Sequence, residues 1–292
     1  MQKPRAIIRR GNRKYMNMQT QTNNGFTLVE LSIVLVIIGL LIGGILVGQS
    51  LIESAKINAQ IKQLQQFDIA TNNFKTKFKC LPADCSRVGF VGFVGAPPQF
   101  GDGNGLFDAN TSAANGNWVS TEQYHFFSAL SSSGMVNKTY GHCNGSGNCS
   151  GAAGANWSGL IGSPGLWPEL KIAPKKGMMV VGGKDGSIHY FLGINQSGMA
   201  FYSGIADLPI ILPIHAAALD SKLDDGFAST GNVFASTNLP TAKSACTGCT
   251  NTDPTVMQLD VTNGACTNSG TPRTYNSTST SLCRVVIKAE VN

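Results

Sequence analysis

The chain has 292 residues, of which 42% are hydrophobic and 13% are charged. This balance excludes general disorder, which goes with low hydrophobicity and high net charge. The formal net charge of +6 arises before Gly25, from Lys3, Arg5, Arg9, Arg10, Arg13 and Lys14. Without those six of the 22 cations, 16 remain against 16 anions, which excludes a basic nucleic-acid-binding body.

An uncharged segment long enough to cross a membrane follows the basic leader. Residues 31–52 contain no charged side chain, and at about 1.5 Å per residue this length matches the hydrocarbon core of a bilayer. The six charged side chains of the leader are all positive, and Glu30 is the one acidic side chain before the apolar segment. The positive-inside rule therefore places the leader in the cytoplasm. We therefore expect one membrane pass, with everything after Ser50 exported.

The junction between leader and apolar segment reads Asn24-Gly25-Phe26-Thr27-Leu28-Val29-Glu30-Leu31. A polar leader, a glycine, an aromatic residue and one carboxylate before an apolar run closely resemble the signal of type IV pilins and pseudopilins. In that family, an inner-membrane prepilin peptidase cuts after the glycine and methylates the new N-terminal amine. The resemblance implies cleavage between Gly25 and Phe26, N-methylation of Phe26, and a role in assembly for Glu30.

The position of Glu30 supports this interpretation on physical grounds. A carboxylate at the edge of a lipid-embedded helix costs about a few kcal/mol unless it is paired. Cleavage after Gly25 creates the amine of Phe26 four residues away, on the same helical face. In the family, the amine that matters belongs to the neighbouring subunit. The alternative is an uncleaved signal anchor, in which Glu30 lies among the lipid headgroups.

Helical periodicity continues beyond the membrane segment. Apolar side chains recur at intervals of three, four or seven residues, at Ile57, Ile61, Leu64, Phe67, Phe74 and Phe78. This pattern predicts one helix from Phe26 to about Lys79, whose second half packs on a sheet or, as the less common use of such a stripe, lines a ligand groove. Three parts result: a cleaved leader over 1–25, the helix over 26–79 and an exported head over 80–292.

The head is expected to combine helix and sheet. A capped amphipathic helix is predicted over 120–136, stopped by Gly134, and residues 208–215 are interpreted as a buried turn. Short apolar or alternating runs predict strands at 178–181, 188–192, 256–261 and 284–291. The fold class is therefore α+β, with an antiparallel sheet against the long N-terminal helix.

Three elements in the head resemble a subgroup of pilin-like proteins: Leu81-Pro82-Ala83-Asp84, the turn Gly101–Gly105, and Leu223-Asp224-Asp225-Gly226. In the first, an alanine replaces the glycine of the pattern. Some pseudopilins use calcium to hold a C-terminal loop, and the candidate ligands here are Asp102, Asn104, Asp108, Asp224 and Asp225. The candidate calcium loop that begins at Asp102 has Ala113 at its twelfth position, where a complete calcium motif has a glutamate. An Asx-turn network is therefore the alternative.

The eight cysteines all follow residue 79, in a part of the chain exported to a compartment where disulfides persist. Cys80 with Cys85 and Cys143 with Cys149 are close enough to form local bonds. The last four, Cys246, Cys249, Cys266 and Cys283, can pair locally or crosswise, or they can bind zinc.

No catalytic motif stands out. The four histidines, His125, His142, His189 and His215, belong to no metalloprotease, hydrolase or nucleotide-binding pattern, so we expect no enzyme and no cofactor other than the calcium considered above. The expected function is structural: the chain is a subunit of a type IV pilus-like filament or a type II secretion pseudopilus, and its large head favours a minor or specialised subunit. The opposing hypothesis is an uncleaved, membrane-anchored periplasmic enzyme or binding protein.

Overall fold

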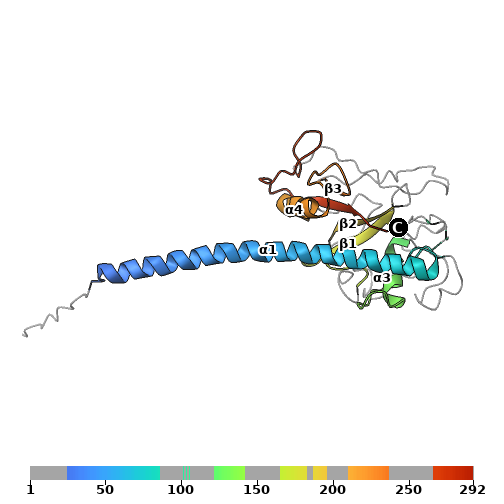
Figure 1. Cartoon of the computed structure of the whole chain (residues 1–292), viewed down its shortest axis with the longest axis horizontal. Coiled ribbons are helices and arrows are strands. Elements are labelled where there is room, and N and C mark those ends of the chain that lie inside the picture. Colours follow the sequence, from blue (N-terminus) through green and yellow to red (C-terminus); the bar gives the residue numbers. More distant parts are fainter. Residues whose placement is uncertain are drawn as a thin grey trace, which may run out of the picture. The chain divides into compact units, whose positions relative to one another are not determined.

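The computed structural model describes residues 25–85, 101, 103, 105, 122–141, 165–182, 187–195, 210–236 and 266–291 (Figure 1). The chain divides into two compact units, residues 1–50 and residues 51–292. The second unit contains the C-terminal part of the long helix together with the head, so the contacts between these two are contacts within one unit.

Helix α1 spans Leu28–Phe78 and confirms the prediction of one long N-terminal helix. It begins two residues later than expected, because Thr27 caps it from outside. It ends where Lys79 takes a left-handed φ of 61°. An acidic side chain in the first turn and two lysines in the last turn complement the partial charges at the helix ends.

The head contains a four-stranded antiparallel sheet with the strand order β1-β2-β4-β3. The strands are β1 Lys176–Gly182, β2 Ile188–Asn195, β3 Val233–Ser236 and β4 Arg284–Lys288. β1, β2 and β4 coincide with predicted strands, although β4 ends before the predicted limit at 291. The predicted strand at 256–261 lies outside the described residues. β3 was not predicted, because a strand of four residues shows too little alternation to be recognised.

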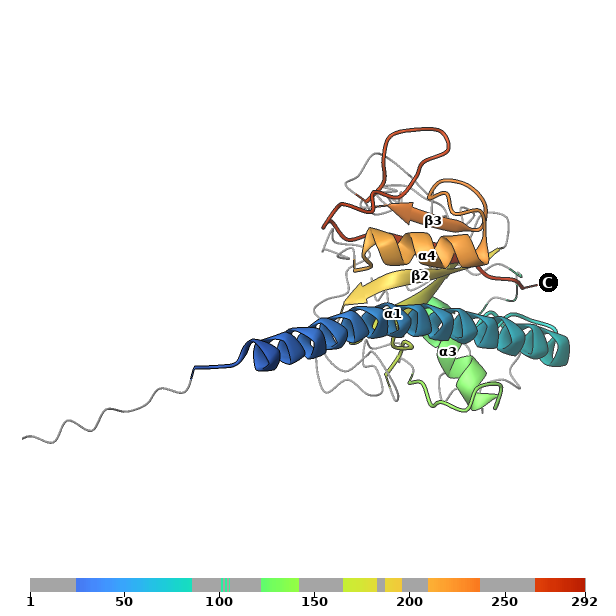
Figure 2. The same cartoon turned by 60° about the vertical axis from the view of Figure 1, so that its left-hand side comes forward.

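Two further helices contact the sheet, α3 Glu122–Ser132 next to β1 and α4 Pro213–Leu223 next to β3 (Figure 2). α3 lies within the helix predicted over 120–136, and Gly134 follows it with a φ of 74°. Of residues 208–215, interpreted as a buried turn, residues 213–215 instead begin α4, so that interpretation was wrong for them, whereas residues 208–209 lie outside the described residues. Pro213 occupies the first turn of α4, where its missing N–H leaves no bond unmade, and good helix formers follow.

The second half of α1 buries the apolar stripe that the periodicity predicted. Its six members all pack into the core of the head: Ile57, Ile61, Leu64, Phe67, Phe74 and Phe78. Phe67 meets Phe127 of α3 edge to face, with ring centroids 4.9 Å apart. This part of α1 runs between α3 and α4 in both views (Figures 1 and 2). The stripe is therefore a packing surface and not a ligand groove.

Two buried amides on the same face of α1 were not anticipated. Gln60 accepts the N–H of Lys171 at 2.8 Å, and Gln63 donates to the carbonyl of Glu169 at 3.1 Å. The segment they hold pairs with β1, through a bridge between Glu169 and Gly177. The two glutamines thus bond to backbone at the edge of the sheet, where a leucine would leave buried polar groups unsatisfied.

A second polar contact joins α1 to the middle of the sheet. Tyr190 of β2 donates its hydroxyl to Oδ1 of Asp68 at 2.9 Å, and Asn72 donates to the carbonyl of Glu290 at 2.9 Å. Burial raises the pKa of the Asp68 carboxyl from its usual 3.8 to about 6, although the bond from Tyr190 lowers it, and the charge of Glu290 adds to the rise. Both β2 and the C-terminal segment are therefore attached to α1.

We expect the unfolding free energy of the head to fall as the pH rises from about 4 to about 6. A carboxyl with a raised folded-state pKa binds its proton more tightly in the folded chain, so its contribution to stability is complete below the unfolded pKa and lost through the folded pKa. Asp68→Asn should flatten this pH dependence by on the order of 1 kcal/mol, after allowance for solvent screening of a half-buried group. Urea unfolding at a series of pH values measures the effect.

The control for this experiment is Asp225→Asn. Hydrogen bonds lower the pKa of Asp225, and its charge helps to raise the pKa of Asp220, so its removal should flatten the slope between pH 4 and 6 less than Asp68→Asn does. An equal slope in Asp68→Asn and in the unmodified chain would contradict the assignment.

Candidate functional site

A capping box formed by Thr27 and Glu30 starts helix α1. Thr27 donates its backbone N–H and its hydroxyl to Oε2 of Glu30, at 2.8 and 2.9 Å. Its Oγ1 accepts the N–H of Glu30 at 3.2 Å. These reciprocal bonds satisfy two donors that a helix N-terminus leaves open. Glu30 therefore has a hydrogen-bonding partner within its own chain, a role for Thr27 that the sequence analysis missed although the Thr-x-x-Glu spacing signals it.

The expected cleavage position lies directly before this cap. Gly25 and Phe26 are not helical, and Phe26 is 91% exposed. A Cβ built on Gly25 would meet no atom of the described structure within 4 Å, so the fold itself makes no demand for glycine at this position. A requirement for glycine here would have to come from another protein that approaches the backbone closely.

The first half of α1 exposes apolar side chains on all of its sides. Each of the following is more than a third exposed: Leu31, Ile33, Val34, Leu35, Val36, Ile37, Ile38, Leu40, Leu41, Ile42, Ile45, Leu46, Val47, Leu51 and Ile52. By length and composition, α1 can cross a membrane. A helix that is apolar all round is stable in lipid or within an assembly, and not in water.

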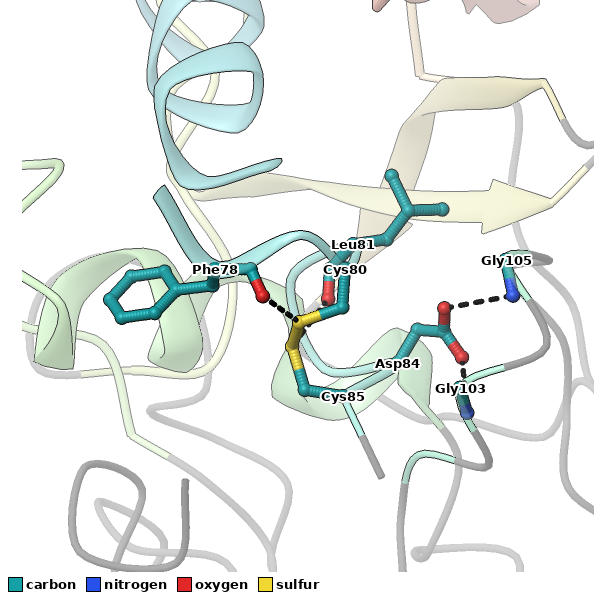
Figure 3. The surroundings of a disulfide bond; sticks show 7 residues. All are labelled: Phe78, Cys80, Leu81, Asp84, Cys85, Gly103 and Gly105. Atoms are coloured by element: carbon teal, nitrogen blue, oxygen red, sulfur yellow. Dashed lines mark hydrogen bonds between the residues drawn. A yellow bond between two sulfur atoms is a disulfide. The ribbon is translucent and has the colours of Figure 1, made fainter. Parts of the chain in front are cut away.

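A disulfide closes the loop that follows α1. The bond joins Cys80 to Cys85, and Asp84 between them is fully buried (Figure 3). The Asp84 carboxylate accepts the N–H of Gly103 at 2.9 Å on one oxygen and the N–H of Gly105 at 3.1 Å on the other. The first two elements of the subgroup pattern are therefore one structural unit, in which a carboxylate organises a glycine-rich turn.

The alanine that departs from the subgroup pattern is in a left-handed conformation. Ala83 has a φ of 73°, which costs a residue with a Cβ about 1 kcal/mol. Close packing surrounds it, since a Cβ on Gly101 would lie 2.4 Å from the Ala83 carbonyl oxygen.

We expect Ala83→Gly to stabilise the head by about 0.5 kcal/mol, because the relief of backbone strain exceeds the entropy that glycine adds to the unfolded chain. Thermal and urea unfolding of the purified chain measure the change. Ala129→Gly in helix α3 is the matched control and should destabilise by about 1 kcal/mol. A destabilised Ala83→Gly variant would show that residue 83 is not strained.

A second disulfide joins Cys266 to Cys283, both of which are fully buried. This bond engages two of the four sulfur atoms considered for zinc, which argues against that alternative. The four cysteines within the described ranges are thus all paired. The other four, Cys143, Cys149, Cys246 and Cys249, lie outside the described residues.

Removal of the second disulfide should destabilise the head more than removal of the first. The bonds span sequence separations of 17 and 5 residues, and loop closure of these lengths is worth about 3 and about 2 kcal/mol. Unfolding of the double variants Cys266→Ala/Cys283→Ala and Cys80→Ala/Cys85→Ala, compared with the unmodified chain, tests this order. Free thiols at all four positions in exported protein would refute the pairing.

Two of the residues considered for calcium lie next to a third carboxylate. Asp220, Asp224 and Asp225 each place an oxygen within 4.8 Å of the others. Asp220 accepts the Tyr275 hydroxyl at 2.6 Å and the Gly226 N–H at 3.0 Å. Burial, opposed by these bonds and assisted by the two neighbouring charges, raises the pKa of Asp220 to about 6.

Hydrogen bonds within the segment engage these carboxylates. Asp225 accepts the Thr230 hydroxyl at 2.6 Å and the Phe227 N–H at 2.8 Å, and these bonds lower its pKa. Asp224 accepts the N–H of Asn232. This is the Asx-turn network named as the alternative to calcium. With one oxygen from each, the three carboxylates supply three of the six to eight oxygen ligands that calcium takes. The remaining candidates, Asp102, Asn104 and Asp108, lie outside the described residues, so calcium binding stays a prediction.

Comparison with known proteins identifies the N-terminal region. Residues 21–46 match the family model described as "Prokaryotic N-terminal methylation motif", and this range includes Gly25, Phe26 and Glu30. Searches among curated proteins and among solved structures gave no match. The matched motif is typical of type IV pilins and pseudopilins, which confirms the resemblance drawn from these residues.

The motif and the long apolar helix together indicate a pilin-like subunit. Proteins of this kind are typically structural and not enzymatic. The motif implies processing by a prepilin peptidase and assembly into a pilus, and the exposed apolar helix is consistent with an inner-membrane anchor before assembly.

Proposed function

We propose that the chain is a structural subunit of a type IV pilus-like filament or a type II secretion pseudopilus. Prepilin peptidase cuts between Gly25 and Phe26 and methylates the amine of Phe26. Before assembly, residues 31–52 anchor the subunit in the inner membrane, and the head over 80–292 lies in the periplasm. The observation that carries this proposal is the register of Gly25, Phe26 and Glu30 with the exposed apolar half of α1.

The exposed apolar side chains explain why assembly is the function. Burial of each large apolar side chain lowers the free energy by about 1.5–3 kcal/mol relative to exposure to water. The first half of α1 can therefore leave the lipid only if its new surroundings bury these side chains equally well. A bundle of copies of the same helix provides such a place. The partners we propose are therefore prepilin peptidase, other pilin or pseudopilin subunits, an inner-membrane assembly platform, and membrane lipid before assembly.

We further propose that the subunit is minor or specialised. The head of more than 200 residues is larger than a filament needs for packing alone, and its sheet, the described helices α3 and α4 and two described disulfides form a substantial folded body. Nucleic acid is not an expected ligand, because the cations and anions after Gly25 balance.

The mature N-terminus tests the proposal most directly. Mass spectrometry of protein from membranes and from sheared filaments should find Phe26 as the first residue, carrying one added methyl group. An intact Met1 would overturn the proposal and favour the uncleaved, membrane-anchored enzyme or binding protein. A filament fraction that contains the protein supports assembly, whereas processed protein confined to membranes argues against it.

A further inference from the structure

We propose that Thr27 is a positioning residue, which holds the Glu30 carboxylate in the orientation that the N-terminal amine of a second copy binds. The inference rests on the proposed function, since it concerns how two copies meet. It assigns to Thr27 a role in assembly that is distinct from its role in starting the helix.

The geometry places both donors of Thr27 on one oxygen of Glu30. The backbone N–H and the hydroxyl end on Oε2, at 2.8 and 2.9 Å, and neither bond uses Oε1. Ser32, the next polar side chain along α1, donates to the carbonyl of Val29 at 2.8 Å instead. Among the described residues, Thr27 is thus the residue whose bonds define where the Glu30 carboxylate points.

The surroundings make this orientation consequential. Phe26, Leu28, Val29 and Leu31 are exposed apolar residues, so the carboxylate lies at the edge of a surface that enters lipid or an assembly. In such a setting a carboxylate needs its hydrogen bonds satisfied before a partner arrives. Thr27 satisfies Oε2 within the chain, and Oε1 accepts the partner's amine.

Pre-orientation also lowers the entropy lost on association. A glutamate side chain has several rotatable bonds, and a partner that binds a freely rotating carboxylate must immobilise it. Threonine is β-branched and stiff at χ1, and its hydroxyl is locked on both sides by the capping box. The amine of a second copy therefore meets an oxygen that is already in place.

Helix capping alone is the competing explanation, and four variants separate the two roles. Thr27→Val removes the hydroxyl altogether. Thr27→Ser keeps both donors. Thr27→Asp remains a good helix cap but has no side-chain hydrogen to donate to Glu30. Glu30→Gln keeps the capping box, which accepts glutamine as well as glutamate, but it lacks the charge that an amine pairs with.

The experiment expresses each full-length variant together with the unmodified chain in cells that assemble it. Mass spectrometry measures leader removal, and the variant's share of sheared filaments measures assembly. Thr27→Ser should assemble normally. Thr27→Val, Thr27→Asp and Glu30→Gln should be processed normally, yet their share of filaments should fall about tenfold, as expected when one hydrogen bond to a charged group is lost.

The outcomes distinguish failure of this inference from failure of the proposed function. If the unmodified chain keeps Met1 or forms no filaments, the proposed function fails. If it is processed and assembled and Thr27→Asp assembles equally well, Thr27 only caps the helix and the inference fails. Loss of leader removal in Thr27→Val would also overturn the inference, because Thr27 would then serve recognition by the peptidase.

Discussion

Gly25→Arg should leave the leader attached to the whole population of chains, and Gly25→Ala should be cleaved poorly. The reason lies outside the fold: a Cβ at position 25 meets nothing within 4 Å in the described structure, so neither change disturbs the chain itself. A peptidase that grips the backbone closely before the cut tolerates only the smallest side chain there. Because the amine of Phe26 is then never released, we also expect no Gly25→Arg protein in filaments.

The fraction of chains that begin at Phe26, measured by mass spectrometry, tests this expectation. Gly39→Ala is the matched control, because a Cβ at Gly39 also meets nothing within 4 Å but lies inside the apolar helix. It should be processed like the unmodified chain. Normal cleavage of Gly25→Arg would refute the cleavage position.

Glu30→Ala should be inserted and cleaved normally, yet its entry into filaments should fall at least tenfold. The apolar span suffices for anchoring, and the peptidase acts five residues away at Gly25, so neither step needs the carboxylate. Insertion should even be easier without a charge at the edge of the span. On the proposed function, assembly requires the carboxylate, because it would pair with the Phe26 amine of an adjacent subunit and an amine left unpaired there is strongly unfavourable.

Glu30→Asp, which keeps the charge, is the control, and it should enter filaments nearly as well as the unmodified chain. Each variant is co-expressed with the unmodified chain, and cleaved protein is quantified in membranes and in sheared filaments. If Glu30→Ala enters filaments as efficiently as the unmodified chain while Phe26 is its N-terminus, then no pair between subunits forms at Glu30.

Local sequence patterns predicted the elements whose stability is decided locally. The stripe from Ile57 to Phe78 predicted the buried face of α1, because burial of one helix face imposes its period on the sequence. The strands β1, β2 and β4 were recognisable from short apolar runs for the same reason. The helix cap at Thr27 was readable in principle, since a capping box joins residues three apart.

Elements that depend on distant partners were not predictable in the same way. β3 has four residues and is defined by its pairing with β4, in which Phe234 lies opposite Val286. α4 begins with an apolar run around Pro213 that resembles a turn until its contact with β3 is known. The buried amides Gln60 and Gln63 interrupt the apolar stripe, and only the backbone that they bond explains them.

The sequence by itself determined the N-terminal methylation motif, because Gly25, Phe26, Glu30 and the apolar span lie within one continuous stretch of the chain. The tertiary structure decided the arrangements in the head: the Asp84 carboxylate on the amides of Gly103 and Gly105, and the meeting of Asp220 with Tyr275. These contacts join residues that are about 20 to 55 positions apart. Their existence depends on how the whole chain packs, and short-range patterns carry no record of that.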